Sequence, residues 1–169
     1  MRILTYIAIT LMLFASVSKC VAAADPSKEA FRDYRAALYG FGEGLGRGVL
    51  LTGKSGSIRT EANAHDLGKT DKIELITLPG VELRVRRIPT SEVPVIELLI
   101  VKRTGFALPL ELRVGSSTQK DVEDTLGRPD KVQGATFFYD GLAESCSDNY
   151  SFHFEHKSLV RIEWHWCAD

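Results

Sequence analysis

The sequence predicts an α+β fold, in which helices combine with half-buried β-strands, and three observations support this prediction. Apolar residues recur at spacings of three or four between Phe31 and Phe41, as on one face of an amphipathic helix. From Asp71 onward apolar and polar residues alternate, as in strands with one buried face. A short helix with clear start and stop signals near 116–127 separates two groups of predicted strands.

The N-terminus has the layout of a secretory signal peptide. Met1-Arg2 is basic, the run from Ile3 to Val17 is apolar, and small residues up to Ala24 form an Ala-x-Ala end. An apolar run of about 15 residues is too short to span a bilayer, which takes about 20. We expect residues 1–24 to be removed by cleavage near Ala24, which makes the protein exported, either periplasmic or secreted.

The three cysteines bear on the compartment. Cys20 leaves a lipid anchor as the alternative to cleavage near Ala24, but Lys19 precedes it, whereas acylated cysteines follow small residues. Without Cys20, Cys146 and Cys167 remain, and two cysteines in an exported chain usually pair. The sequence therefore predicts a Cys146–Cys167 disulfide, with two free buried thiols as the alternative.

The charge balance argues against one class of partner. Without Arg2 and Lys19 the 21 basic residues fall to 19, against 22 acidic ones, which gives a net charge near −3. Nucleic-acid binding calls for a basic stripe, so we expect no nucleic-acid partner. Nor does any later segment predict a membrane span. Residues 25–169 have a comfortable length for one compact domain.

Residues 25–55 predict a helix followed by a glycine-rich segment. Asp25-Pro26-Ser27 is typical of a helix start. Glycines at positions 40, 42, 44, 46 and 48 either end this helix or let another backbone approach it, and the entropy cost of glycine favours an early end. Gly48–Ser55 also matches the phosphate-binding pattern Gly-x-x-x-x-Gly-Lys-Ser/Thr, but no strand precedes it and no helix follows it. We therefore expect no nucleotide there.

The remaining elements follow from alternation and turn signals. Strands are predicted over 73–77, 81–86, 95–102, 131–139, 150–155 and 159–167, with a turn at Pro79-Gly80. In the short helix, Ser116 or Ser117 is the expected cap, and Val122 and Leu126 lie one turn apart on the buried face. Gly127 and then Pro129 end this helix.

An internal repeat predicts the arrangement of these elements. Residues 56–73 align without a gap on residues 115–132, with identities at Gly56/Gly115, Ser57/Ser116, Leu67/Leu126, Gly68/Gly127, Asp71/Asp130 and Lys72/Lys131. In each copy the aligned segment precedes three predicted strands. The sequence therefore predicts two tandem helix-plus-three-strand units, over 56–103 and 112–169, with chance similarity as the alternative.

The second unit carries a recognisable set of residues. They are Leu112-Arg-Val-Gly115-Ser, Asp121-Val122, Leu126-Gly-Arg-Pro129-Asp130, Tyr139 and Phe152-x-Phe154…Leu159…Ile162-x-Trp164. This unit, clearest over 112–166, resembles the domain shared by the small outer-membrane assembly lipoproteins of the SmpA/OmlA (BamE) type and the β-lactamase-inhibitor proteins. The resemblance implies helices packed on one face of an antiparallel β-sheet, with tandem copies in the inhibitor proteins.

The last hairpin has two candidate registers. Matching the apolar faces pairs Phe152 with Ile162 and Phe154 with Val160, whereas a two-residue turn at His156-Lys157 shifts the pairing by one. A β-bulge would reconcile the two registers. Domains of the type that the second unit resembles usually carry Asn-Gly at this turn.

No residue set predicts chemistry. His153 and His156 point to opposite faces of a regular strand, and no cysteine or carboxylate cluster completes a metal site with His165. No nucleophile signature appears either. We expect no metal, no cofactor and no catalytic residue, so the chain is predicted not to be an enzyme, with a small periplasmic hydrolase as the alternative from another class.

The two faces of the predicted sheet differ in character. Trp164 and Trp166 share their side of the strand with Ile162 and are predicted to lie in the core. The opposite face is expected to bind a partner through charged residues, namely Glu82, Arg84, Arg86, Glu97, His153, Arg161, Glu163 and His165. An ordinary solvated face is the alternative.

The function that this sequence favours is an exported protein-binding module. Its partner would be an envelope component, or an enzyme or toxin that it inhibits as an inhibitor or immunity protein. An envelope-assembly accessory protein is the alternative. Charge reversal at Arg84 and Arg86 is expected to weaken binding without lowering stability, as surface substitutions usually do.

Overall fold

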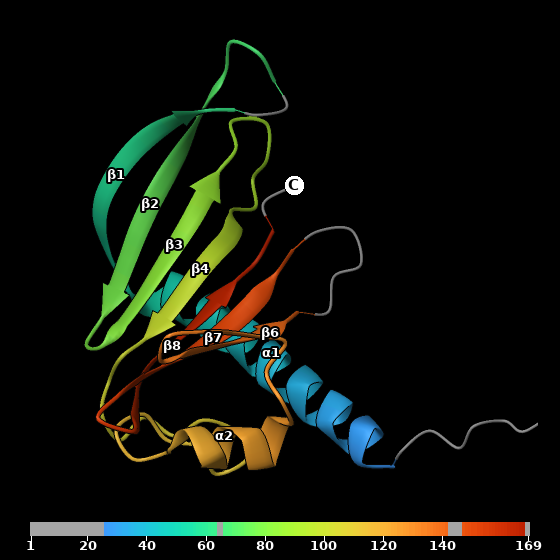
Figure 1. Ribbon diagram of the computed structural model, residues 1–169. Coiled ribbons are helices and arrows are strands. Elements are labelled where there is room, and N and C mark those ends of the chain that lie inside the picture. Colours follow the sequence, from blue (N-terminus) through green and yellow to red (C-terminus); the bar gives the residue numbers. More distant parts are fainter. Residues whose placement is uncertain (1–25, 64–65, 142–146, 168–169) are drawn as a thin grey trace, which may run out of the picture.

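The computed structural model describes residues 26–63, 66–141 and 147–167, which form one antiparallel eight-stranded sheet and two helices. The prediction of an α+β fold is confirmed. In chain order the elements are α1 (Pro26–Thr52), β1 (Lys54–Ala62), β2 (Thr70–Leu78), β3 (Val81–Arg87), β4 (Val95–Val101), α2 (Gln119–Leu126), β5 (Lys131–Gln133), β6 (Thr136–Asp140), β7 (Asn149–Glu155) and β8 (Ser158–His165). Figure 1 shows α1 running across the sheet near its middle.

The chain order reads as one helix followed by four strands, and then the same again. Across the sheet the strands run β1-β2-β3-β4-β8-β7-β6-β5, so the last strand of each half joins the two halves. Each half therefore has four strands, and not the three predicted. In the first half the extra strand is β1. In the second half the strand predicted over 131–139 is divided into β5 and β6 by a turn at Gly134, which has φ 60°.

The prediction of a helix at the start of the first repeat copy is wrong. Residues 54–62 form β1, which pairs antiparallel with β2 from Lys54↔Thr77 to Ala62↔Thr70. Pairing along a neighbouring strand decides the structure of this polar segment, because its own residues favour neither state strongly. The helix of the first half is α1 instead, so the tandem helix-plus-three-strand arrangement is not confirmed.

Helix α1 does not end in the glycine-rich segment, contrary to the expectation. It continues to Thr52, and two of the glycines meet the sheet side chains at close range. A Cβ on Gly42 would lie 2.5 Å from Trp164 Nε1, and one on Gly46 would lie 3.3 Å from Ile96. The close approach of helix to sheet that these glycines permit offsets their helix-breaking cost.

Helix α2 is capped by Thr118, and not by Ser116 or Ser117. The Thr118 hydroxyl accepts from the Asp121 amide at 3.3 Å, and the Asp121 carboxylate accepts from the Thr118 amide at 2.7 Å. Gly127 ends the helix at φ 76°, as predicted, and its amide donates to the Glu123 carbonyl. Arg35 of α1 donates to the Leu126 carbonyl at 3.0 Å and joins the two helices.

Both helices pack on the same face of the sheet. Val122 and Leu126 of α2 and Leu38 and Val49 of α1 belong to one buried cluster with the strands. Trp164 is fully buried in this cluster, as predicted, and its indole Nε1 donates to the Leu38 carbonyl at 3.2 Å. Trp166 is half-buried at the edge of the cluster, packed edge-on against Tyr39.

The last hairpin combines the two candidate registers through a β-bulge. Phe152 pairs with Ile162, in the register that matches the apolar faces, whereas Phe154 pairs with Leu159, in the register of the two-residue turn. The bulge lies between His153 and Phe154. His156 and Lys157 both have positive φ, at 48° and 70°, as a two-residue turn of this hand requires.

Some predictions fall on residues that the structure does not describe. The signal peptide over 1–24 and its cleavage near Ala24 lie outside the described residues, and so does Cys146 of the predicted disulfide. These stay predictions. Among the helices of the described ranges, none is long and apolar enough to cross a membrane.

Candidate functional site

The face of the sheet turned away from both helices carries all eight of the charged residues that the sequence singles out. Strand pairing sets this, because Leu83 and Leu99 face the helices while their neighbours Arg84 and Leu98 face the other way. Leu98 lies opposite His165, and Ile100 opposite Glu163. We call this side of β1, β2, β3, β4, β8, β7 and β6 the open face, since neither described helix covers it.

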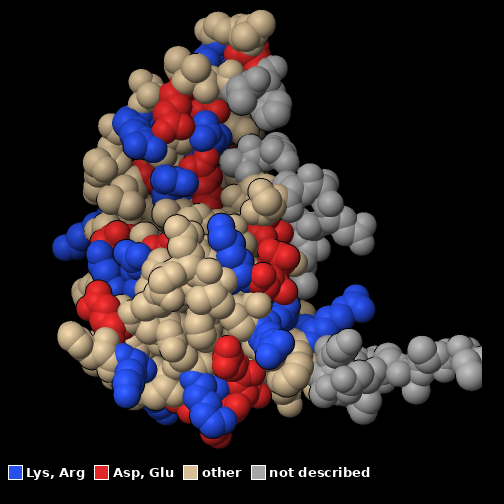
Figure 2. Space-filling model, in the orientation of Figure 1, with Lys and Arg blue, Asp and Glu red and all other residues tan. Residues whose placement is uncertain are grey.

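An apolar stripe on β4 divides the open face. Leu98 and Ile100 are half-buried and lie between Arg84 and Glu82 of β3 on one side and His165 and Glu163 of β8 on the other. Figure 2 shows a wider area without lysine, arginine, aspartate or glutamate in the lower centre of the view, where Figure 1 labels β6, β7 and β8, bordered by charged side chains. An apolar centre with a charged surround is the usual anatomy of a protein interface.

The first charged cluster is built around Arg86. Its guanidinium donates to Glu97 at 2.5 Å, to Asp71 at 3.0 Å and to Glu61 at 3.2 Å. Arg84 pairs with the second Glu97 oxygen at 3.0 Å. Burial alone would lower the pKa of Arg86, but the hydrogen bonds to the three carboxylates outweigh it and raise the pKa.

The second charged cluster is built around Glu163. Its carboxylate lies 3.1 Å from His165 Nε2, 3.5 Å from His153 Nε2 and 3.0 Å from Arg161 Nε. Hydrogen bonding to His153 and His165, with the Arg161 charge added, holds the pKa of Glu163 well below its usual range although burial opposes this. The carboxylate is therefore ionised at neutral pH.

In each cluster one central carboxylate, Glu97 or Glu163, lies deeper than an arginine that pairs with it. The side chain of Glu97 is 7% exposed and that of Arg84 is 38% exposed, and Glu163 at 14% lies beneath Arg161 at 43%. The open face therefore presents guanidinium groups outward over buried carboxylates. Two hollows lie beside these groups, one of about 160 Å³ lined by Arg84 and one of about 430 Å³ lined by Arg161 and His153.

The geometry around His153 bears on the hydrolase alternative. Ser151 Oγ lies 3.0 Å from His153 Nε2, and Glu163 approaches the same nitrogen at 3.5 Å, while Nδ1 faces Thr136 and Arg161. A catalytic triad needs the acid on the imidazole nitrogen opposite the serine. The side chain of Ser151 is also buried, so this group of residues is not arranged as a triad.

Within the described ranges, no group of three or more histidine, cysteine or carboxylate side chains is placed to hold a metal ion. His153, Glu163 and His165 come together, as the sheet register requires. His156 instead lies in the hairpin turn and is exposed.

Sequence reasoning missed part of the site. Asp71 and Glu61 complete the Arg86 cluster, but their place depends on the pairing of β1 with β2, which the repeat alignment obscured. The sequence identifies Leu98 and Ile100 only as part of an apolar strand. Their signal was the run Val95–Val101, which is apolar on both faces except at Glu97.

Glu163→Gln is expected to lower the free energy of unfolding by about 1–3 kcal/mol at pH 7. The change removes the negative charge that His153, Arg161 and His165 surround in the folded protein. Because the folded-state pKa of Glu163 is lowered, its contribution is complete above the unfolded pKa, about 4.3, and declines as the pH falls from there. Urea unfolding at pH 7 and pH 3 measures this.

The matched control is Glu82→Gln, which alters a more exposed pair with Lys102 and is expected to cost less than about 1 kcal/mol. A difference between wild type and Glu163→Gln that stayed the same at both pH values would contradict the ionised state of Glu163.

Comparisons with protein-family models, with characterised proteins and with solved structures give no match for this chain.

Proposed function

We propose that the protein is an exported, non-enzymatic protein-binding module that acts through its open face. The observation that carries this proposal is the pairing of an apolar stripe, Leu98 and Ile100, with outward guanidinium groups on both sides. A partner would cover the stripe with apolar side chains and meet the guanidinium groups with carboxylates. Its contact surface is therefore acidic around an apolar centre.

Preorganisation supports this proposal. Arg84 and Arg161 each rest on a buried carboxylate, which holds them in place without neutralising their outer side. Side chains that are already ordered lose less entropy on binding than mobile ones. A face of this kind suits a partner of fixed shape, such as an enzyme or toxin that the protein inhibits, and an envelope component is the alternative.

The resemblance of residues 112–166 to the BamE-type and β-lactamase-inhibitor domains points the same way. Two halves, each of a helix and four strands, fit an origin from tandem units, although the units differ in extent from those that the sequence repeat suggests. Export would place the protein among envelope or secreted partners, in accord with the predicted signal peptide over 1–24.

The test uses a double variant, Arg84→Gln with Arg161→Gln. Each change leaves the buried carboxylate another base, Arg86 for Glu97 and the two histidines for Glu163, so the fold is expected to hold. The purified protein captures its partner from an envelope extract, and the identified partner is then purified. The double variant is expected to bind this partner at least about tenfold more weakly than wild type.

The matched control is Arg32→Gln with Arg128→Gln, which removes the same charge from exposed positions off the open face. It is expected to bind within about twofold of wild type. Equal dissociation constants for wild type and the open-face double variant, or the same loss in the control, would contradict the proposal.

A further inference from the structure

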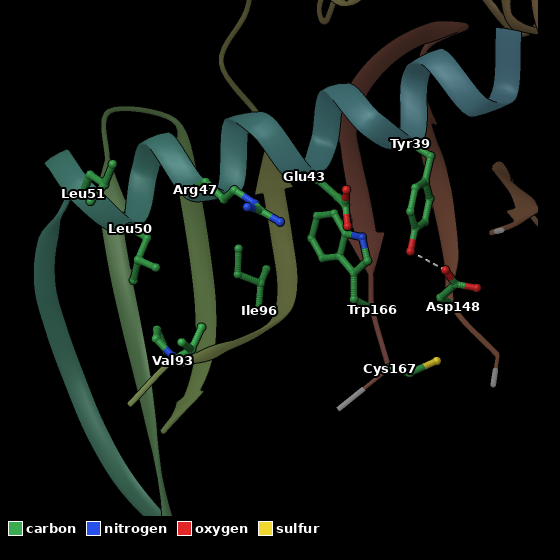
Figure 3. A pocket seen from close by; sticks show the side chains of 11 residues that line it. Tyr39, Glu43, Arg47, Leu50, Leu51, Val93, Ile96, Asp148, Trp166 and Cys167 are labelled. Atoms are coloured by element: carbon green, nitrogen blue, oxygen red, sulfur yellow. Dashed lines mark hydrogen bonds between the residues drawn. The ribbon is translucent and has the colours of Figure 1, made fainter. Parts of the chain in front are cut away.

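A cleft of about 630 Å³ lies on the helical side of the sheet, away from the open face. Figure 3 shows α1 forming one wall, with β4, the loop before it and the residues after β8 forming the other. The volume is within the range of sites that take small molecules. The side chains of α1 that enter it come from positions 39, 43, 47, 50 and 51, so they lie along the cleft in chain order.

One end of the cleft is apolar. Figure 3 shows Leu50 of α1 pointing toward Val93 across it, and Leu51, Pro94 and Ile96 also line this end. Leu51 is 84% exposed and Val93 is 72% exposed, so two of the most exposed large apolar side chains of the described residues form its two lips. Exposed apolar surface that converges on one cleft is typical of a binding site.

The other end is aromatic and acidic. Tyr39 and Trp166 pack edge-on with ring centroids 6.2 Å apart, and Figure 3 places Glu43 beside the Trp166 ring. The Tyr39 hydroxyl donates to the buried Asp148 carboxylate. Burial raises the pKa of Tyr39 most, and the Asp148 and Glu43 carboxylates raise it further, so two carboxylates act on this end of the cleft. Aromatic faces beside a carboxylate attract a cation.

Arg47 lies between the two ends, one helical turn from Glu43. Of the ion pairs among the described residues, none involves Arg47 or Glu43, so both charges are available to a ligand. Along the cleft the order is therefore an apolar surface, a cation, and then an acid with two aromatic rings.

We propose that this cleft binds a single-chain zwitterionic amphiphile whose anionic group lies between its apolar chain and its cation, as in an alkyl phosphocholine. The chain occupies the space between Leu50, Leu51, Val93 and Ile96. The phosphate meets the Arg47 guanidinium, and the quaternary ammonium lies against the Trp166 and Tyr39 rings beside Glu43. Four residues, about 6 Å of helix rise, separate Arg47 from Glu43, which suits a two-carbon linker between the charges.

The order of charges allows a sharp test by titration calorimetry on the full chain, with each probe kept below its micelle concentration. Decylphosphocholine is compared with a decyl sulfobetaine, which has the same chain and no net charge but carries its ammonium next to the chain. Decyl maltoside serves as the uncharged probe. We expect decylphosphocholine to bind at one site, at least about tenfold tighter than either of the others.

Variants identify the charges responsible. Arg47→Gln and Glu43→Gln are each expected to weaken decylphosphocholine binding by about fivefold or more, and to leave decyl maltoside binding unchanged. Arg32→Gln, on α1 but outside the cleft, is the matched control and is expected to change neither. Because positions 43 and 47 are exposed, these changes do not disturb the core.

Equal affinity for the two zwitterionic probes would overturn the proposed order, and the absence of saturable binding would overturn the site. An equal loss in Arg32→Gln would assign the effect to net charge and would also overturn it. We do not expect the protein to co-sediment with phosphatidylcholine vesicles, because the cleft holds one chain and this lipid has two. Co-sedimentation would overturn the single-chain site in favour of binding to a membrane surface.

Discussion

Replacing Arg86 by methionine is expected to lower the free energy of unfolding by about 3–5 kcal/mol, which removes much of the stability of a domain this size. The change leaves the carboxylates of Asp71 and Glu97, which are 2% and 7% exposed as residues, without their shared base. Glu97 keeps its pair with Arg84, but the almost fully buried carboxylate of Asp71 loses its arginine, and this buried charge accounts for most of the expected loss. Urea unfolding of wild type and variant at pH 7 measures the loss.

The matched control is Arg59→Met, which removes an arginine that is 64% exposed and paired with Glu61 at 2.7 Å. It is expected to cost less than about 1 kcal/mol. An equally small loss for Arg86→Met would show that Asp71 and Glu97 do not depend on it. The expectation that charge reversal at Arg84 and Arg86 leaves stability unchanged is corrected for Arg86. Its side chain is only 18% exposed and is paired with buried carboxylates, whereas that of Arg84 is 38% exposed.

Trp164→Ala is expected to cost about 3–5 kcal/mol, the usual loss for a large aromatic side chain in a core. Trp164 is fully buried between the sheet and α1, and it also donates to the Leu38 carbonyl. The cavity that this substitution leaves is expected to stay unfilled, because Gly42, which faces the indole, has no side chain to occupy it. Thermal and urea unfolding measure the loss.

Trp166→Ala is the control for Trp164→Ala, since Trp166 is only half-buried at the edge of the core and is expected to cost clearly less. A Trp164→Ala variant that kept wild-type stability but lost partner binding would mean that the two faces of the sheet have been assigned the wrong way round.

Alternation of side chains was enough to predict the two faces of the sheet. In β3, Val81, Leu83 and Val85 are buried while the residues between them are not, and the same period places Ile162 and Trp164 inward on β8. In the last hairpin this period and the turn length indicate different registers, and the bulge in the structure accommodates both. The eight charged residues of the open face could therefore be assigned to one side of the sheet, whereas Glu61, Asp71 and the apolar stripe could not.

The first half of the chain was predicted less well, for physical reasons. Glycines at 42 and 46 cost helix stability locally, and only the close packing of α1 on Trp164 and Ile96 explains their place. β1 is an edge strand that is exposed along most of its length, so it lacks the alternation that identifies a half-buried strand. The cleft depends on α1 reaching Leu50 and Leu51, and it was therefore missed as well.

The measurement that tests the open face most directly is methyl NMR of the labelled protein, titrated with the partner that it captures. Leu98 and Ile100 lie at the centre of the open face, whereas Leu51 and Val93 lie on the lips of the cleft. We expect the methyl signals of Leu98 and Ile100 to shift and broaden on binding, while those of Leu51 and Val93 keep their positions. Shifts confined to Leu51 and Val93, with Leu98 and Ile100 unchanged, would contradict it.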